Sequence, residues 1–114
     1  MEHCNDFKFD LMLGQITEKE LADILTNKKI EVKDDSAKSF KTGNVFIEFE
    51  SRGKASGIAT THSDFYAIKT SHNSFVLIET QKLKQIARKH IDRIVLGGDN
   101  NTSKGVLIPR CELL

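Results

Sequence analysis

The sequence contains few cysteines and no long apolar run, and both absences narrow the class of protein. Cys4 and Cys111 are its only cysteines; they lie near opposite ends of the chain and form no C-x-x-C pair. A disulfide framework and a structural zinc site are therefore not expected. No stretch approaches the roughly eighteen consecutive apolar residues of a membrane span. Residues 1–10 carry acids instead of the apolar run of a secretory signal. We expect a cytoplasmic protein that does not enter a membrane.

Proline, repeats and low-complexity segments are scarce too. Pro109 is the only proline, and no Pro/Gly-rich linker divides the chain. Hydrophobic residues make up 39% and charged residues 29% of the sequence, as in ordinary soluble globular proteins. A length of 114 residues suits one domain and is too short for two. Residues 1–114 are therefore predicted to form a single domain.

Familiar cofactor motifs are missing, and so is a strong charge of one sign. The four histidines show no metal-ligand spacing, and the loop at residues 97–101 lacks the glycine order of a nucleotide-binding motif. The net charge of +1 gives no general affinity for nucleic acid. Residues 81–93 nevertheless hold one acid against five basic side chains: Lys82, Lys84, Arg88, Lys89 and Arg93. Such a face suits phosphate binding, although a solvated helix face explains it equally well.

The first clear structural signal is a helix start. Residues 17–20, Thr-Glu-Lys-Glu, form a capping box in which Thr17 caps the helix and Glu20 bonds back to its amide. The apolar face that follows predicts a helix of about ten residues ending near Asn27. That face consists of Leu21, Ile24 and Leu25.

Two alternating runs then predict strands at residues 29–35 and 44–51. Ile30 and Val32 share one face of the first run, opposite its charged residues. Apolar side chains share one face of the second run: Val45, Ile47 and Phe49. The connection between the runs is polar and ends in Thr-Gly-Asn at residues 42–44, which favours an antiparallel hairpin.

The second half of the chain predicts further elements in the order strand, strand, helix, loop, strand. These are strands at residues 65–70 and 74–79, a helix from about residue 80 with Leu83, Ile86 and Ala87 facing inward, a loop at 97–101 and a strand at 106–108. The complete order predicts an α/β fold with a mixed central sheet flanked by helices.

Charged residues of the two predicted hairpin strands point to metal chemistry. Glu31, Lys33, Asp35 and Glu48 would share one face, where cross-strand neighbours lie about 5 Å apart. Clustered carboxylates repel one another unless a cation neutralises them, and oxygen ligands without Cys or His favour Mg²⁺ or Mn²⁺. A lysine beside them can stabilise charge on a phosphate under attack. The pattern fits metal-assisted hydrolysis of a phosphodiester, although the solvated face of an edge hairpin is the plain alternative.

The same residues carry a resemblance to a known family. The sequence G-x-x-x-E-x-E-L at residues 14–21 is similar to the opening helix of archaeal-type Holliday junction resolvases, which implies an active-site role for Glu18. I-E-V-K at residues 30–33 resembles the catalytic strand of the PD-(D/E)XK nuclease superfamily. Together with T-G-N-x-x-I-E at 42–48 and S-G-I-x-x-T-x-x-D at 56–64, it resembles small phage proteins of that superfamily.

The resemblance implies a restriction-endonuclease-like core of three layers and an Mg²⁺- or Mn²⁺-dependent DNA endonuclease, with branched DNA as one candidate substrate. A junction resolvase would also need to be a homodimer. One position departs from the family pattern, because Glu50 stands where the lysine of E-x-K is expected. We expect Lys33 to serve from the earlier strand, with Glu31 beside it and the metal bound by Glu18, Asp35 and Glu48.

The remaining candidates are contacts to DNA. They are Lys54, Ser56, Thr60, Thr61, Lys82 and Arg88. An ordinary turn explains the serine and threonines equally well, and Glu20 has a sufficient role in the capping box. The competing prediction for the whole protein is a nuclease-like fold that binds DNA or another protein without cleavage, which the missing lysine would permit.

Overall fold

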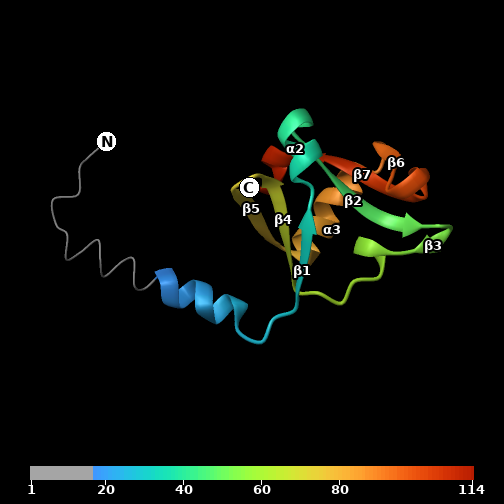
Figure 1. The fold of residues 1–114 in the computed structure, drawn as a ribbon. Coiled ribbons are helices and arrows are strands. Elements are labelled where there is room, and N and C mark those ends of the chain that lie inside the picture. Colours follow the sequence, from blue (N-terminus) through green and yellow to red (C-terminus); the bar gives the residue numbers. More distant parts are fainter. Residues whose placement is uncertain (1–16) are drawn as a thin grey trace.

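A computed structural model describes residues 17–114 of the chain, and in it the strands form two sheets (Figure 1). Sheet A has three strands in the order β1 (Ile30–Asp34), β4 (Phe65–Ser71) and β5 (Ser74–Glu79). Sheet B has four strands in the order β3 (Lys54–Ala55), β2 (Asn44–Ser51), β7 (Ser103–Pro109) and β6 (Ile94–Gly97). β1 runs parallel to β4, and every other pair is antiparallel.

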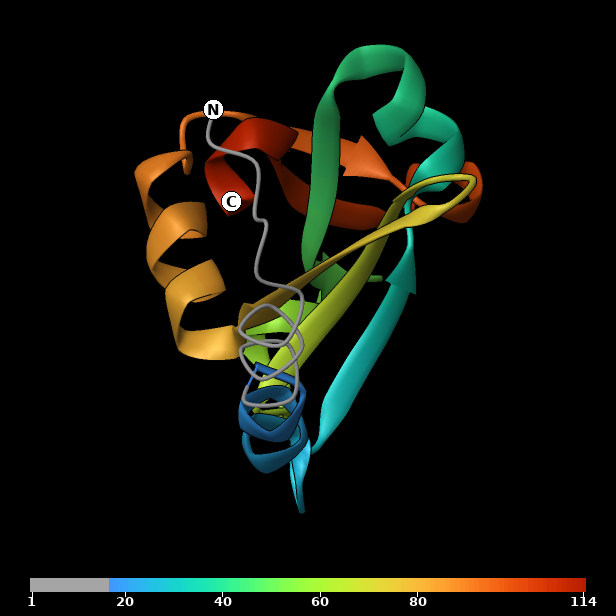
Figure 2. The same ribbon diagram turned by 90° about the vertical axis from the view of Figure 1, so that its left-hand side faces the viewer.

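Helices connect and cover the sheets. The helix α2 (Ser36–Thr42) joins β1 to β2, and α3 (Thr80–Lys89) follows β5 and packs against β4, β5 and β7 (Figure 2). Short 3₁₀ turns lie at η1 (Gly57–Ala59), η2 (Asp99–Asn101) and η3 (Arg110–Leu113). A further helix at residues 17–25 projects from the start of β1 away from both sheets and leaves Leu21 and Ile24 about half exposed (Figures 1 and 2).

The hydrophobic core joins both sheets and α3. Its members come from β2, η1, β4, β5, α3, β7 and η3: Val45, Ile47, Ile58, Tyr66, Ile68, Ile78, Leu83, Ile86, Ala87, Val106, Ile108 and Leu113. The inward faces predicted for β2 and α3 are confirmed, since the alternation of β2 and the 3.6-residue period of α3 place these side chains on the buried side.

Most predicted elements are present, and the coarse prediction of an α/β fold with mixed pairing is confirmed. The helix at 17–25, the strands β1, β2, β4 and β5, the helix α3 and the late strand β7 all lie where the sequence indicates. β6 was not predicted. Its four residues, Ile94–Gly97, are too few to show a period.

The predicted hairpin between β1 and β2 is wrong. β1 pairs with β4, while β2 pairs with β3 and β7 in the other sheet. The polar segment between β1 and β2 forms the helix α2. The Thr-Gly-Asn sequence ends this helix, because Gly43 is its C-cap and adopts a left-handed conformation at φ 74°. Alternation identifies a strand but does not select its partner.

The single central sheet flanked by helices is also replaced by two sheets that share one core. Among residues 17–114, no helix covers the outer face of sheet A, where Val32 and Phe75 are 65% and 60% exposed. None of the described helices is long and apolar enough to cross a membrane.

Candidate functional site

A pocket of about 620 Å³ lies where the β1–α2 connection meets sheet B. Charged and aromatic side chains from both sheets and from α2 line it, among them Lys33, Asp35, Lys38, Phe46, Glu48 and Tyr66. Its size is in the range of ordinary ligand sites. Three of the predicted site residues, Lys33, Asp35 and Glu48, therefore do line one cavity, although their strands belong to different sheets.

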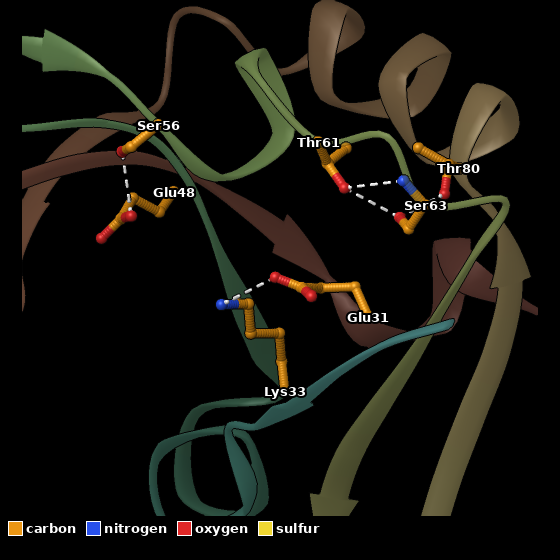
Figure 3. Close-up of polar contacts among 7 residues, drawn as sticks. All are labelled: Glu31, Lys33, Glu48, Ser56, Thr61, Ser63 and Thr80. Carbon is orange, nitrogen blue, oxygen red and sulfur yellow. Dashed lines mark hydrogen bonds and ion pairs between the residues drawn. The ribbon is translucent and has the colours of Figure 1, made fainter. Parts of the chain in front are cut away.

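Glu48 is held in place by the turn that follows β3. The Ser56 hydroxyl donates a hydrogen bond of 2.9 Å to the Glu48 carboxylate (Figure 3). Close packing of η1 on β2 makes this contact possible, because a Cβ at Gly57 would lie 2.3 Å from the Glu48 carbonyl oxygen. Gly57 also has φ +53°, which favours glycine. The sequence Ser-Gly is therefore required locally: glycine permits the approach and serine binds the carboxylate.

A β-bulge separates Glu48 from Glu50. Glu48 lies opposite Gly105 on β7, whereas Glu50 lies opposite Lys104, with the register shift between them. Consecutive residues of β7 face opposite sides of the sheet, so the bulge turns the two glutamates to different faces. Glu50 forms an ion pair of 3.4 Å with Lys104. Glu50 therefore points away from the pocket, on the face of sheet B opposite to Glu48.

Glu31 and Lys33 are alternate residues of β1 and share one face. The Lys33 ammonium lies 3.4 Å from the Glu31 carboxylate, and both side chains are about half exposed (Figure 3). Glu31 is the register partner of Tyr66 on β4. The face that carries Glu31 and Lys33 is thus the face on which Tyr66 and Ile68 enter the core.

Asp35 has a structural role at the junction between the sheets. Its carboxylate accepts a hydrogen bond of 3.0 Å from the Phe46 amide of β2. Its own amide donates to the Lys69 carbonyl of β4 at 3.0 Å, and its carbonyl accepts from the Ser39 amide at 2.9 Å. Burial raises the pKa of Asp35 above its usual 3.8, and the Phe46 amide and Lys38 oppose that rise. The residue connects β2 and β4 to the start of α2, and one of its carboxylate oxygens already accepts a hydrogen bond from the Phe46 amide.

Tyr66 is buried between the two sheets, and charged groups of both sheets affect its hydroxyl. Its side chain is 2% exposed, and burial is the first cause that raises the pKa of its hydroxyl. The negative charges of Glu31 and Glu48 raise that pKa further, so both carboxylates lie near the phenol. Thr61 acts in the opposite direction, yet no hydrogen bond of ordinary geometry joins the Tyr66 hydroxyl to any described residue.

Other predicted site residues do not line the pocket. Glu18 is exposed on the projecting helix and does not line the pocket. Thr61 bonds to Ser63, with its hydroxyl donating at 2.9 Å. Thr60, Lys54 and Lys82 are exposed. Glu31 is not part of the pocket lining either. It is linked to the site by its ion pair with Lys33 and by the effect of its charge on the Tyr66 hydroxyl.

Arg88 lies near the site but across η1 from it. Gly57 lines the pocket, whereas the next two residues of η1 line a second hollow together with Lys84 and Arg88. The basic pair on α3 is therefore Lys84 and Arg88, four residues apart on one helix face, and Lys82 does not belong to it. One turn of chain separates this basic face from Glu48.

Sequence reasoning missed three residues of the pocket. Tyr66 is the only tyrosine of the chain and sits at a buried position of an alternating strand, where a hydroxyl needs a partner; that signal was available. Lys38 lies in α2, within the polar segment for which the sequence predicts a hairpin connection. Phe46 lies against Gly97 and Gly105 of β6 and β7, which no local pattern indicates.

Comparison with protein family models, with curated proteins and with solved structures found no match. Within residues 17–114 there is also no group of three or more Asp, Glu, His or Cys side chains arranged to hold a metal. The chemistry must therefore be argued from Glu31, Lys33, Glu48 and Tyr66 themselves.

Proposed function

We propose that this chain is a metal-dependent endonuclease that hydrolyses phosphodiester bonds in DNA, with a restriction-endonuclease-like ancestry that the sequence resemblance implies. The observation that carries the proposal is the pocket that Lys33, Asp35 and Glu48 line together from different sheets, with Glu31 paired to Lys33 at its edge. Two carboxylates and a lysine in one pocket are groups that phosphodiester hydrolysis uses.

The donor set fits Mg²⁺ or Mn²⁺ bound together with substrate. Mg²⁺ is usually held by one or two carboxylates, and waters and substrate phosphates complete its octahedron. Glu48 and Glu31 would supply the carboxylates, and Asp35, which accepts a hydrogen bond from the Phe46 amide through one oxygen, also lines the pocket. When bound, the cation would supply charge stabilisation at the phosphate and a more acidic water.

The other groups have roles that do not depend on the cation. Ser56 fixes one oxygen of Glu48, so the carboxylate keeps its direction when substrate arrives. Lys33 can exchange its half-exposed partner Glu31 for a phosphate oxygen, because an ion pair of two half-exposed side chains is worth only about 0–1 kcal/mol. Lys38 at the pocket rim, and Lys84 and Arg88 across η1, would hold the phosphates on either side.

The decisive experiment compares Glu48→Gln with Glu50→Gln. The chemical change is the same, but the bulge places the two side chains on opposite faces of sheet B. We expect Mg²⁺-dependent cleavage of labelled duplex, single-stranded and four-way-junction DNA to fall more than about 100-fold in Glu48→Gln, since changes to residues that only support metal ligands already cost about 10- to 100-fold. Glu50→Gln should cleave like wild type and lose less than about 1 kcal/mol of stability.

A second function is favoured by one observation. The described residues hold no group of three metal ligands, which fits a nuclease-like module that binds DNA or another protein without cleaving. Thermal denaturation with Mg²⁺ or Mn²⁺ separates the two, because a bound cation at 100 times its Kd adds about 2.7 kcal/mol of stability. No cleavage and no cation effect, with DNA binding intact, would select the binding module. Junction cleavage by a dimer in sedimentation would identify a resolvase.

A further inference from the structure

The hydroxyl of Tyr66 is a buried polar group without a use inside the protein. The side chain is 2% exposed, and its oxygen has no hydrogen-bond partner among the described residues. An unpaired buried hydroxyl destabilises a fold, and phenylalanine would fill the same space without that cost. A tyrosine here is therefore unfavourable for folding alone.

The polar neighbours of the hydroxyl make their hydrogen bonds and ion pairs with other groups. Glu48 accepts the Ser56 hydroxyl at 2.9 Å, and Glu31 pairs with Lys33 at 3.4 Å. The Thr61 hydroxyl donates to Ser63 and accepts the Ser63 amide at 3.1 Å. The hydroxyl of a tyrosine carries its proton at neutral pH, so it can act as a hydrogen-bond donor.

We propose that the Tyr66 hydroxyl donates a hydrogen bond to a phosphate oxygen of the nucleic acid bound between Lys33 and Glu48. The inference rests on the proposed function and names a further substrate contact for it. A phosphate oxygen is the acceptor that suits the pocket, because Lys33 and Lys38 line it and a divalent cation would offset the carboxylates of Asp34, Asp35 and Glu48, which line it too. The hydroxyl oxygen has almost no accessible surface in the free protein, so binding would require side chains of the pocket wall to move. The phosphate would then satisfy the hydroxyl and take Lys33 from Glu31.

The test uses two variants that each remove one unpaired buried hydroxyl. Ser39 in α2 is fully buried and its hydroxyl is also unpaired, but Ser39 does not line the pocket. Tyr66→Phe and Ser39→Ala therefore make the same kind of change to stability, since each removes one unpaired buried hydroxyl. Both should have a melting temperature equal to or above that of wild type, as expected when an unpaired buried hydroxyl is removed.

Function should separate the two variants. We expect Tyr66→Phe to bind a labelled single-stranded oligonucleotide about 10- to 100-fold more weakly in Ca²⁺, and to show at least the same loss in kcat/KM in Mg²⁺. Ser39→Ala should match wild type in both assays. A lower melting temperature for Tyr66→Phe, or unchanged oligonucleotide affinity, would overturn the inference.

The design also distinguishes this inference from the proposed function. If wild type binds the oligonucleotide but cleaves no DNA, the nuclease proposal fails and the affinity of Tyr66→Phe still decides the role of the hydroxyl. If wild type cleaves DNA and Tyr66→Phe binds and cleaves equally well, only the role of Tyr66 fails. If wild type binds no oligonucleotide, both are overturned.

Discussion

Replacing Gly57 with alanine tests the contact on which the arrangement of the site depends. A Cβ at this position would lie 2.3 Å from the Glu48 carbonyl oxygen, whereas ordinary contact begins at 3.4 Å. The turn η1 must therefore move away from β2 by about 1 Å, and overpacking of this kind costs about 1–3 kcal/mol. The backbone at φ +53° adds about 1–2 kcal/mol for a side chain in the left-handed region. We expect Gly57→Ala to lower the free energy of unfolding by about 2–5 kcal/mol.

Gly53 provides the matched control. It has φ +79°, and a Cβ there would meet no atom within 4 Å. Gly53→Ala therefore carries the left-handed strain alone, about 1–2 kcal/mol, and both substitutions restrict the unfolded chain equally. Urea denaturation of the two variants measures the difference. Equal destabilisation would refute the reasoning, since it would mean that η1 does not pack on β2 at Glu48. We also expect Gly57→Ala, and not Gly53→Ala, to lose DNA cleavage, because the shift separates Ser56 from the carboxylate.

Two further predictions concern the walls of the pocket. Because burial raises the pKa of Asp35 above 3.8, the folded state holds that proton more tightly than the unfolded state. Wild type should lose stability relative to Asp35→Asn as the pH rises from about 3.8 through the folded-state pKa. Denaturation of both proteins between about pH 3 and pH 7 checks this, and a difference that is independent of pH would contradict it. A Cβ at Gly97 would lie 2.8 Å from the Phe46 ring, and the three atoms nearest to it all belong to that ring. Gly97→Ala should therefore cost about 1–3 kcal/mol alone and less in Phe46→Leu; additive free energies in this double-mutant cycle would exclude the contact.

The strands and helices were largely predictable because their signals are local. The alternation of β2 and the period of α3 depend only on which side chains share a face, and those faces became the buried ones. The pairing of β1 was not predictable in this way. An alternating strand fits beside β2 or β4 equally well, and only the whole core selects β4.

The sequence by itself determined which residues can carry the chemistry. Residue type and local pattern identify three candidate site residues, Glu31, Lys33 and Glu48. The sequence also indicates a turn at Ser56 and Gly57. The tertiary structure decided which of these meet. The bulge at Glu48 turns Glu50 away, and the helix at 17–25 keeps Glu18 apart from the pocket. The pairing of β1 with β4 brings Tyr66 beside Glu31. The physical reason is that side-chain direction follows from local backbone geometry, whereas proximity between strands follows from the packing of a core that many distant residues share.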